Sequence, residues 1–244
     1  MKALSGAGHA VSVVLPDSPQ SWISKAHLVG KSLTASPLIP NPLTEYEGVE
    51  WTLVNGTPAS CTQLGLHHLT SHRGPVDLVV SGPNWGRNVT TLYNLASGTV
   101  GGALEAAQCG KKAIAISFAS KNAQPSEIIE AACAISAKLI DHLYQNWASE
   151  VELYAINVPM IADIDSRNIV YTQSLPCYWT QSSLFHEVEK GKGGVETKSL
   201  GKPVRRRSGK REFKWQPELD DVHRSVTESG EGTDGWAMKK GYIR

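Results

Sequence analysis

The sequence predicts an α/β fold in which a mostly parallel sheet has helices on both of its faces. As far as about residue 165, short apolar runs rich in β-branched residues alternate with helix-like segments. Parallel neighbours need long crossover connections, usually helices, so this alternation favours a parallel sheet. The 244 residues suffice for one large domain with a sizeable core. The hydrophobic content of 41% is ordinary for a globular protein.

The expected strands are apolar runs bounded by polar, proline or glycine turns, at 11–16, 50–54, 76–81, 112–118 and 153–159. The expected helices cover about 57–73, 99–108 and 125–147. Thr57 suits an N-cap, and Pro58 suits the first helical position. The third helix has apolar residues three or four apart, which indicates a face packed on a sheet. Those residues are Ile128, Ala132, Ile135, Leu139 and Leu143.

Beyond residue 165 the pattern changes, and we expect a β-rich extension, 166–244, in the same domain as the core at 1–165. Three short runs predict strands in it, at 169–173, 211–215 and 222–226. The stretch 189–212 is polar and rich in Lys, Arg and Gly. It is open to two interpretations, a nucleic-acid or nuclear-import patch and a solvated, mobile arm, and the second is favoured.

Composition excludes several classes of protein. The formal net charge of +1 gives no global field for nucleic acid or an anionic membrane. No apolar run reaches the ~20 residues that a membrane-spanning helix needs, and the N-terminus is a poor signal peptide. The four cysteines are widely spaced without a C-x-x-C pair, which favours reduced, buried thiols. We therefore expect a cytoplasmic chain without a membrane partner.

The loop at 81–99 follows an expected strand and contains the strongest candidate site. Ligands of parallel α/β sheets bind at the carboxyl ends of the strands, and this loop lies at such an end. Asn84 offers a neutral oxygen that suits a hard cation such as Mg²⁺, Mn²⁺ or Ca²⁺. Ser97, Gly98 and Thr99 open a helix, where free N–H groups and the helix dipole favour a phosphate-sized anion.

The loop at 15–25 follows the first expected strand and adds further candidates. Asp17 and Ser21 are oxygen donors at the same edge of the sheet, although Asp17 is equally typical of a turn and Ser21 of a plain loop. Trp22 and Trp85 flank the proposed ligands. These indoles suit base stacking, and an equally good interpretation is that they only wall the loop. The histidines show no metal-binding spacing.

Several motifs, in order along most of the chain, together resemble the SurE family of "survival protein" phosphatases and nucleotidases. They are VVLPD…S (13–21), NGTPASC (55–61), DLVVSGPNWGRN (77–88), SGTVGGALEA (97–106), AINVP (155–159) and GTDGWAMKKGY (232–242). The segments at 21–27, 86–91 and 213–215 resemble the fungal branch of this family, some of whose members are fused to a tubulin–tyrosine-ligase-like domain.

The resemblance implies a Rossmann-like sheet and hydrolysis of phosphate monoesters such as nucleoside monophosphates. It implies a divalent cofactor, Mg²⁺ or Mn²⁺, held by two adjacent aspartates, a serine and an asparagine. Ser21 and Asn84 match the metal ligands, and Asn88 joins Asn84 as a catalytic candidate. Asn88 and the turn Ser97-Gly98-Thr99 match the phosphate-facing positions. The resemblance also implies a homodimer or a higher homo-oligomer.

The sequence departs from the family at both ends. Residues 2–8 resemble the last turn of a helix ended by glycine, and the family's first strand with its Asn-Asp-Asp-Gly loop is expected before Lys2. The family's C-terminal strand is cut at Tyr242. We expect an incomplete chain whose activity is weak for lack of carboxylate charge. The alternative is a non-catalytic module that keeps the phosphate turn and binds nucleotide or RNA, or forms oligomers.

Overall fold

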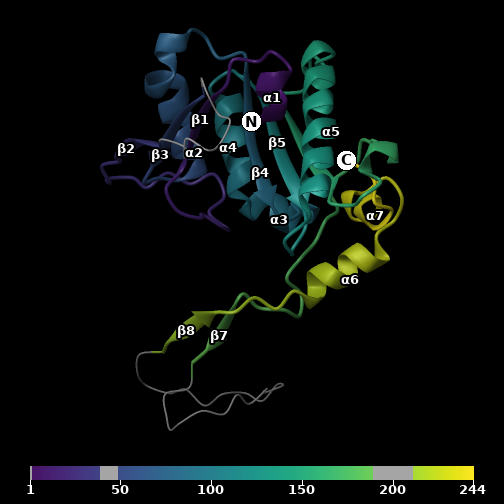
Figure 1. The fold of residues 1–244 in the computed structure, drawn as a ribbon. Helices are drawn as coiled ribbons and strands as arrows, with labels where there is room; N and C mark the ends of the chain where they lie inside the picture. Colours follow the sequence, from purple (N-terminus) through teal and green to yellow (C-terminus); the bar gives the residue numbers. More distant parts are fainter. Residues whose placement is uncertain (1, 39–48, 189–210) are drawn as a thin grey trace.

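The computed structural model describes residues 2–38, 49–188 and 211–244 and shows the α/β architecture that the sequence predicts (Figure 1). In one part of the core, β1 (Ser12–Pro16) runs parallel to β3 (Glu50–Val54), and β2 (Ala35–Leu38) is antiparallel to β3. Helix α2 (Pro58–Leu64) packs beside them, and continues as a π-helical turn, Gly65–Leu69, and a 3₁₀ turn, Ser71–Arg73.

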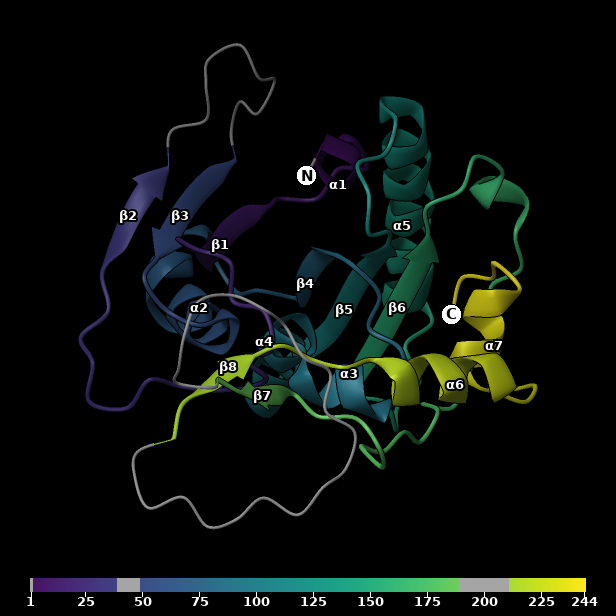
Figure 2. The same ribbon diagram turned by 90° about the horizontal axis from the view of Figure 1, so that it is seen from below.

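The larger part of the core is a parallel sheet of β4 (Leu78–Trp85), β5 (Lys112–Ala119) and β6 (Leu153–Pro159). Its faces are covered by α5 (Ser126–Gln145) on one side and α4 (Gly98–Gln108) on the other (Figures 1 and 2). Successive side chains of a strand point to opposite faces. Ile114 and Ile116 therefore pack with the α5 side of the core, while Ala113 and Ala115 pack with the α4 side.

The two three-stranded sheets are not joined by a ladder of hydrogen bonds. Within the described ranges, β1 pairs only with β3, and β4 pairs only with β5. The residues of β1 are half-buried throughout, and those of β4 are half-buried over most of its length. A short helix, α1 (Lys2–Gly6), precedes β1 and contacts α5, and it ends as the sequence predicts, with Gly8 at φ 92°.

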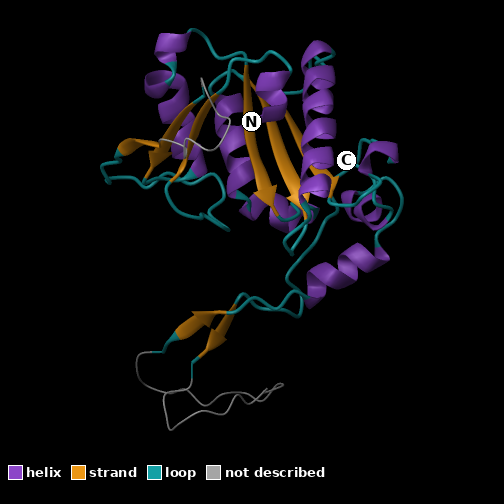
Figure 3. Cartoon of the chain, viewed as in Figure 1, coloured by secondary structure: helices purple, strands orange, loops and turns teal. Residues whose placement is uncertain are grey.

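The C-terminal extension lies beyond the carboxyl ends of β4, β5 and β6 (Figure 3). A 3₁₀ turn, Ile164–Ser166, leads into it, and an antiparallel hairpin of β7 (Phe185–Glu187) and β8 (Phe213–Trp215) projects from it. Helices α6 (Asp220–Glu228) and α7 (Asp234–Lys239) follow. The chain then returns to the core, where Ile243 forms a bridge with Ile169 and the Arg244 backbone bonds to Asn157 of β6.

Several sequence predictions about the extension and loops are wrong. Residues 222–226 form part of α6 instead of a strand, because Val222 and Val226 lie one helical turn apart and pack with Cys177. Residues 169–173 form only isolated bridges. The polar stretch 90–96 is helical, as α3 (Thr90–Ala96), and the exposed strand β2 has no counterpart among the predicted strands.

Three further predictions can be compared with the structure. All four cysteines are free thiols, as predicted. Nearly all of the basic stretch 189–212 lies outside the described residues. Among the residues that are described, no helix is both long enough and apolar enough to cross a bilayer.

Candidate active site

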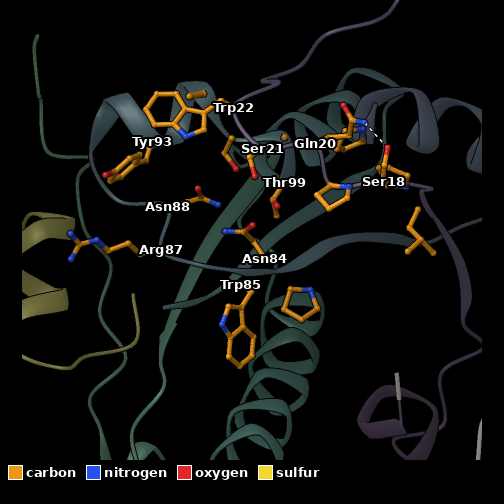
Figure 4. Close-up of a pocket in the computed structure, with 18 of the residues that line it drawn as sticks. Ser18, Gln20, Ser21, Trp22, Asn84, Trp85, Arg87, Asn88, Tyr93 and Thr99 are labelled. Carbon is orange, nitrogen blue, oxygen red and sulfur yellow. Dashed lines mark hydrogen bonds between the residues drawn. The ribbon is translucent and has the colours of Figure 1, made fainter. Parts of the chain in front are cut away.

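A cavity of about 620 Å³ opens where β1 and β4 end and where α4 begins. All nine site residues that the sequence predicts line it (Figure 4). They come from three segments, the loop after β1, the end of β4 with the turn that follows, and the start of α4. They are Asp17, Ser21, Trp22, Asn84, Trp85, Asn88, Ser97, Gly98 and Thr99.

Asn84 lies in a bulged part of β4 where the pairing with β5 shifts register. Gly82 permits this bulge, because a Cβ at its φ of 118° would lie 2.3 Å from the Ile116 carbonyl oxygen. The Asn84 Nδ2 donates to the Gly86 carbonyl at 3.0 Å. This bond uses the donor half of the amide, so the Oδ1 is left as an acceptor for a ligand in the cavity.

Asn88 is buried and is held on three sides by other parts of the chain. Asn157 of β6 brackets its peptide groups, since the Asn157 Oδ1 accepts from the Asn88 N–H at 2.8 Å and the Asn157 Nδ2 donates to the Asn88 carbonyl at 3.0 Å. The Arg244 guanidinium also donates to that carbonyl. The Asn88 Nδ2 donates to the Ser117 Oγ at 2.8 Å. The position of Asn88 is therefore fixed by β5, β6 and the last described residue.

The Asn88 side chain can present either end of its amide to a ligand. Its Oδ1 is the atom left over while the Nδ2 bonds to Ser117, and an oxygen would repel a phosphate. A serine hydroxyl both donates and accepts, however, so Ser117 satisfies the amide equally well after a flip. In the flipped orientation, the Nδ2 faces the cavity as a phosphate donor.

A buried aspartate and its arginine partner support the turn that contains Asn88. Asp234 is fully buried and accepts from the backbone N–H of Thr90 at 2.9 Å and of Leu175 at 3.0 Å. Its partner is Arg244, at 3.4 Å. Burial lowers the pKa of Arg244 to about 10, against the opposing effect of Asp234, so the guanidinium stays charged at neutral pH. Thr90 needs this support because its φ of 69° is left-handed, which is costly for a β-branched residue.

The start of α4 presents donors to the cavity. The Ser97 Oγ caps the helix by accepting from the Val100 N–H at 3.2 Å. The N–H groups of Gly98 and Thr99 have no acceptor among the described residues, and the positive end of the helix dipole lies there. Figure 4 shows Thr99, Asn84 and Ser21 around one common space.

The glycines of α4 allow the loop after β1 to pack directly on the helix. A Cβ at Gly98 would lie 2.9 Å from Ile23, and one at Gly101 would lie 2.3 Å from the Ser24 carbonyl oxygen. Ser24 also bonds to the end of α3, where its N–H donates to the Ala96 carbonyl at 3.0 Å. The absence of a side chain at Gly98 therefore serves packing as well as access for an anion. This packing places Ser21 beside the helix start.

Glu105 of α4 holds the same loop through charge. It is 4% exposed, and Lys25 lies 2.5 Å and His27 3.3 Å from its carboxylate. Gln63 of α2 donates to it at 2.5 Å. Burial acts to raise the pKa of Glu105, but the hydrogen bonds from Lys25, Gln63 and His27 lower it overall. The carboxylate is thus ionised and ties the loop after β1 to α2 and α4.

The two tryptophans have different surroundings. Trp22 lines the cavity and meets Tyr93 edge-on at 5.8 Å between ring centroids and Trp215 of β8 at 5.3 Å, so the hairpin packs against this ring. Trp85 is 46% exposed and points away from Asn84 and Thr99 (Figure 4). Trp22 is therefore better placed than Trp85 to stack on a ligand.

The donor set is only part of what a divalent cation needs. Ser21 and Asn84 supply neutral oxygens, which suit Mg²⁺ or Mn²⁺ in kind. Asp17 is the one carboxylate in the cavity lining, and it is exposed. The described residues hold no cluster of three His, Cys, Asp or Glu side chains that could bind a metal ion. Ser21 and Asn84 could therefore supply part of the coordination of a divalent cation, but the described lining supplies little of the negative charge that such a cation needs.

Sequence reasoning missed the residues that support the site. Asn157 lies in the AINVP motif, but the motif gives no sign that its side chain spans Asn88. Asp234 and Arg244 are far from Asn88 in the sequence, so no spacing pattern links them. Arg87 and Tyr93 also line the cavity, and both lie inside the loop 81–99 that the sequence singles out.

Comparison with known proteins gives a consistent result. The family model described as Survival protein SurE matches residues 1–181. The 5'-nucleotidase SurE of Cytophaga hutchinsonii is 30% identical over 245 residues, which cover 100% of this chain and 81% of that protein. The 5'-nucleotidase SurE of Geobacter sp. strain M21 is 38% identical over 149 residues, 61% of this chain and 54% of that protein.

Two further matches concern a longer protein and a solved structure. The probable tubulin–tyrosine ligase PBY1 of Saccharomyces cerevisiae is 38% identical over 195 residues, 66% of this chain but 26% of that protein. The chain thus spans about a quarter of the yeast protein and about half of the Geobacter one. The crystal structure of the SurE protein from Aquifex aeolicus superposes with a TM-score of 0.65 at 23% identity, covering 99% of this chain and 83% of that one, which shows a shared fold.

Proposed function

Because the chain belongs to the SurE family, we propose that its cavity is a phosphate-monoester site of the 5'-nucleotidase type, with a nucleoside monophosphate as the typical substrate. One observation supports this proposal most strongly. The cavity brings the free N–H groups of the α4 start together with the Asn84 amide and the Asn88 amide. A bound phosphate needs hydrogen-bond donors on one side. A cation on its other side needs oxygen ligands, such as the Asn84 Oδ1.

In the proposed complex, the chain's own residues bind and orient the phosphate. The N–H groups of Gly98 and Thr99 and the Thr99 hydroxyl hold the phosphate oxygens. Asn88 donates to the phosphate through the Nδ2 of its flipped amide, while the Ser117 hydroxyl donates to the Asn88 Oδ1. The N–H groups at the start of α4 are fixed before the ligand arrives, so they stabilise the charge that develops on the phosphoryl oxygens in the transition state.

A divalent cation, Mg²⁺ or Mn²⁺, would complete the site. Ser21 Oγ and Asn84 Oδ1 are the atoms that would face it, with Asp17 as the nearby carboxylate in the same lining. When bound, such an ion polarises the phosphoryl group and lowers the pKa of a bound water. Trp22 would stack on the base, with Tyr93 and Trp215 supporting its ring.

The test is release of phosphate from AMP in the presence of Mn²⁺. Since the described lining has one exposed carboxylate, we expect slow release by the 244-residue chain, reduced at least about tenfold further by Asn84→Ala. The matched control is Asn122→Ala, because Asn122 is exposed and bonds to Ser120 through its backbone. Equal rates for Asn84→Ala and the unchanged chain would refute the assignment of Asn84, and fast release would refute the argument about charge.

A second candidate role is non-catalytic, with the phosphate turn retained for binding and the hairpin used for self-association. Phe185, Phe213 and Trp215 of β7 and β8 are 51%, 50% and 43% exposed. A two-stranded hairpin is marginal by itself, so a second copy of the chain is the partner that would bury these rings. Sedimentation of the Phe213→Ser variant against the unchanged chain separates a monomer from a homodimer or higher homo-oligomer. RNA binding is tested by its loss at high salt.

A further inference from the structure

A second cavity, of about 550 Å³, lies at the carboxyl ends of β5 and β6, next to the first. Its floor is apolar and includes residues 159–161 and Met238. Four cationic side chains line it, Arg87, Arg167, Lys239 and Lys240, and no carboxylate belongs to the described lining. The apolar wall of such a cavity focuses the electric field of the cationic side chains, so the cavity attracts anions.

The four cationic side chains differ in whether they already form hydrogen bonds or ion pairs within the protein. The Lys239 Nζ donates to the carbonyls of Thr227 and Ser229, at 2.8 and 3.2 Å. Arg167 pairs with Asp163 at 2.5 Å. The side chains of Arg87 and Lys240 form neither a hydrogen bond nor a salt bridge with any residue in the described ranges, and the backbone N–H of Lys240 donates to the Trp236 carbonyl. The cluster thus retains two uncommitted cations and an excess of positive charge.

Arg87 lines both cavities. Its guanidinium points away from Asn84 and Thr99, toward the C-terminal helices (Figure 4). The residue lies two positions after the end of β4, so its backbone is fixed by the same turn that positions Asn88. Arg87 therefore lies at the boundary of the two cavities, with its guanidinium on the side of the second.

We propose that this second cavity is a binding site for a phosphoryl group, held by Arg87 and Lys240 with Arg167 and Lys239 behind them. Arginine matches the oxygens of a phosphate with its planar fork, and lysine adds a point charge. The ligand is either the second phosphate of a molecule that also occupies the first cavity or a separate phosphorylated effector. The site does not depend on hydrolysis in the first cavity, so either function can fail without the other.

The experiment is a titration of the ¹⁵N-labelled chain with inorganic phosphate and with pyrophosphate, at constant ionic strength to hold screening fixed. We expect amide shifts at 160–161 and 239–241. Lys240→Gln should weaken the affinity measured at these amides about 3- to 10-fold. Lys138→Gln, at an exposed residue of α5 that lines neither cavity, should leave it unchanged.

The amides at 98–99 report on the first cavity and distinguish the two sources of the phosphoryl group. One molecule that spans both cavities shifts both sets of amides at the same pyrophosphate concentration. A separate effector shifts the amides at 160–161 and 239–241 with phosphate alone, at a midpoint that Asn88→Ala leaves unchanged. The proposal is overturned if these amides do not respond to either anion, or if Lys240→Gln binds as tightly as the unchanged chain.

Discussion

Replacing Asn157 with alanine should destabilise the protein and also loosen the turn that holds Asn88. Asn157 is 1% exposed on β6, so water cannot replace its amide. Its Oδ1 accepts from the Asn88 N–H, and its Nδ2 donates to the Asn88 carbonyl. The substitution removes both bonds at once and leaves a buried N–H without an acceptor.

The magnitude follows from what each Asn88 group keeps. A buried donor left without a partner costs about 1–3 kcal/mol, and this applies in full to the Asn88 N–H. The carbonyl retains Arg244, so its loss is only about 0.5–1.5 kcal/mol. Together the free energy of unfolding should fall by about 1.5–4.5 kcal/mol. For a chain of this size, each kcal/mol shifts the melting temperature by about 2–4 °C, so a decrease of about 6–12 °C is expected at the middle of that range.

Thermal unfolding followed by circular dichroism measures this decrease, and the same sample titrated with inorganic phosphate reports the effect on the site. We expect weaker phosphate binding at the amides of residues 98–99, since Asn88 is no longer held in place. Asn122→Ala serves as the control, because its exposed side chain should change neither quantity. A melting temperature within about 2 °C of the unchanged chain would refute the account of Asn157 as the support of Asn88.

Two other substitutions test the packing of the loop after β1 on α4. Gly101→Ala should lower stability by about 1–3 kcal/mol, because the new Cβ would lie 2.3 Å from the Ser24 carbonyl oxygen. Gly6→Ala, also in a helix but with nothing within 4 Å, should gain up to about 1 kcal/mol, and a similar loss at both sites in thermal melts would contradict the packing argument. Glu105 has a lowered pKa when folded, so its contribution is present above its ordinary value of 4.5 and is lost as the pH falls below it. Stability measured from pH 6 to pH 3 should therefore fall less steeply in Glu105→Gln, and parallel curves would exclude Glu105 as the group responsible.

The core of the fold was predictable because its signals are local. The strand predicted at 153–159 is confirmed, as is the helix predicted at 125–147 within two residues at each end, since apolar periodicity determines both. The prediction failed where local residue types favoured the wrong element. Val222 and Val226 are β-branched and indicated a strand, yet their spacing places both on the buried face of α6.

The residues that line the first cavity were predictable from the sequence, but the residues that support them were not. Ser97 caps a helix that its own neighbours begin, so the sequence shows its role directly. Asp234 supports the Asn88 turn from more than a hundred residues away, through the N–H of Thr90. Only the folded chain brings these groups together, and a lone aspartate after a threonine indicates no more than a helix N-cap region.

The charges around the first cavity predict that its proposed ligands, a cation and a phosphate, bind cooperatively. Arg87 and the start of α4 are positive, and Asp17 is the one carboxylate in the described lining. A dication alone would therefore meet neutral oxygens and little negative charge. A bound phosphate supplies that charge, so cation and phosphate should bind more tightly together than either does alone. Because such coupling is reciprocal, Mn²⁺ should raise the affinity for phosphate by the same factor by which phosphate raises the affinity for Mn²⁺. Equal Mn²⁺ affinities with and without phosphate would mean that the cation draws its negative charge from the protein instead.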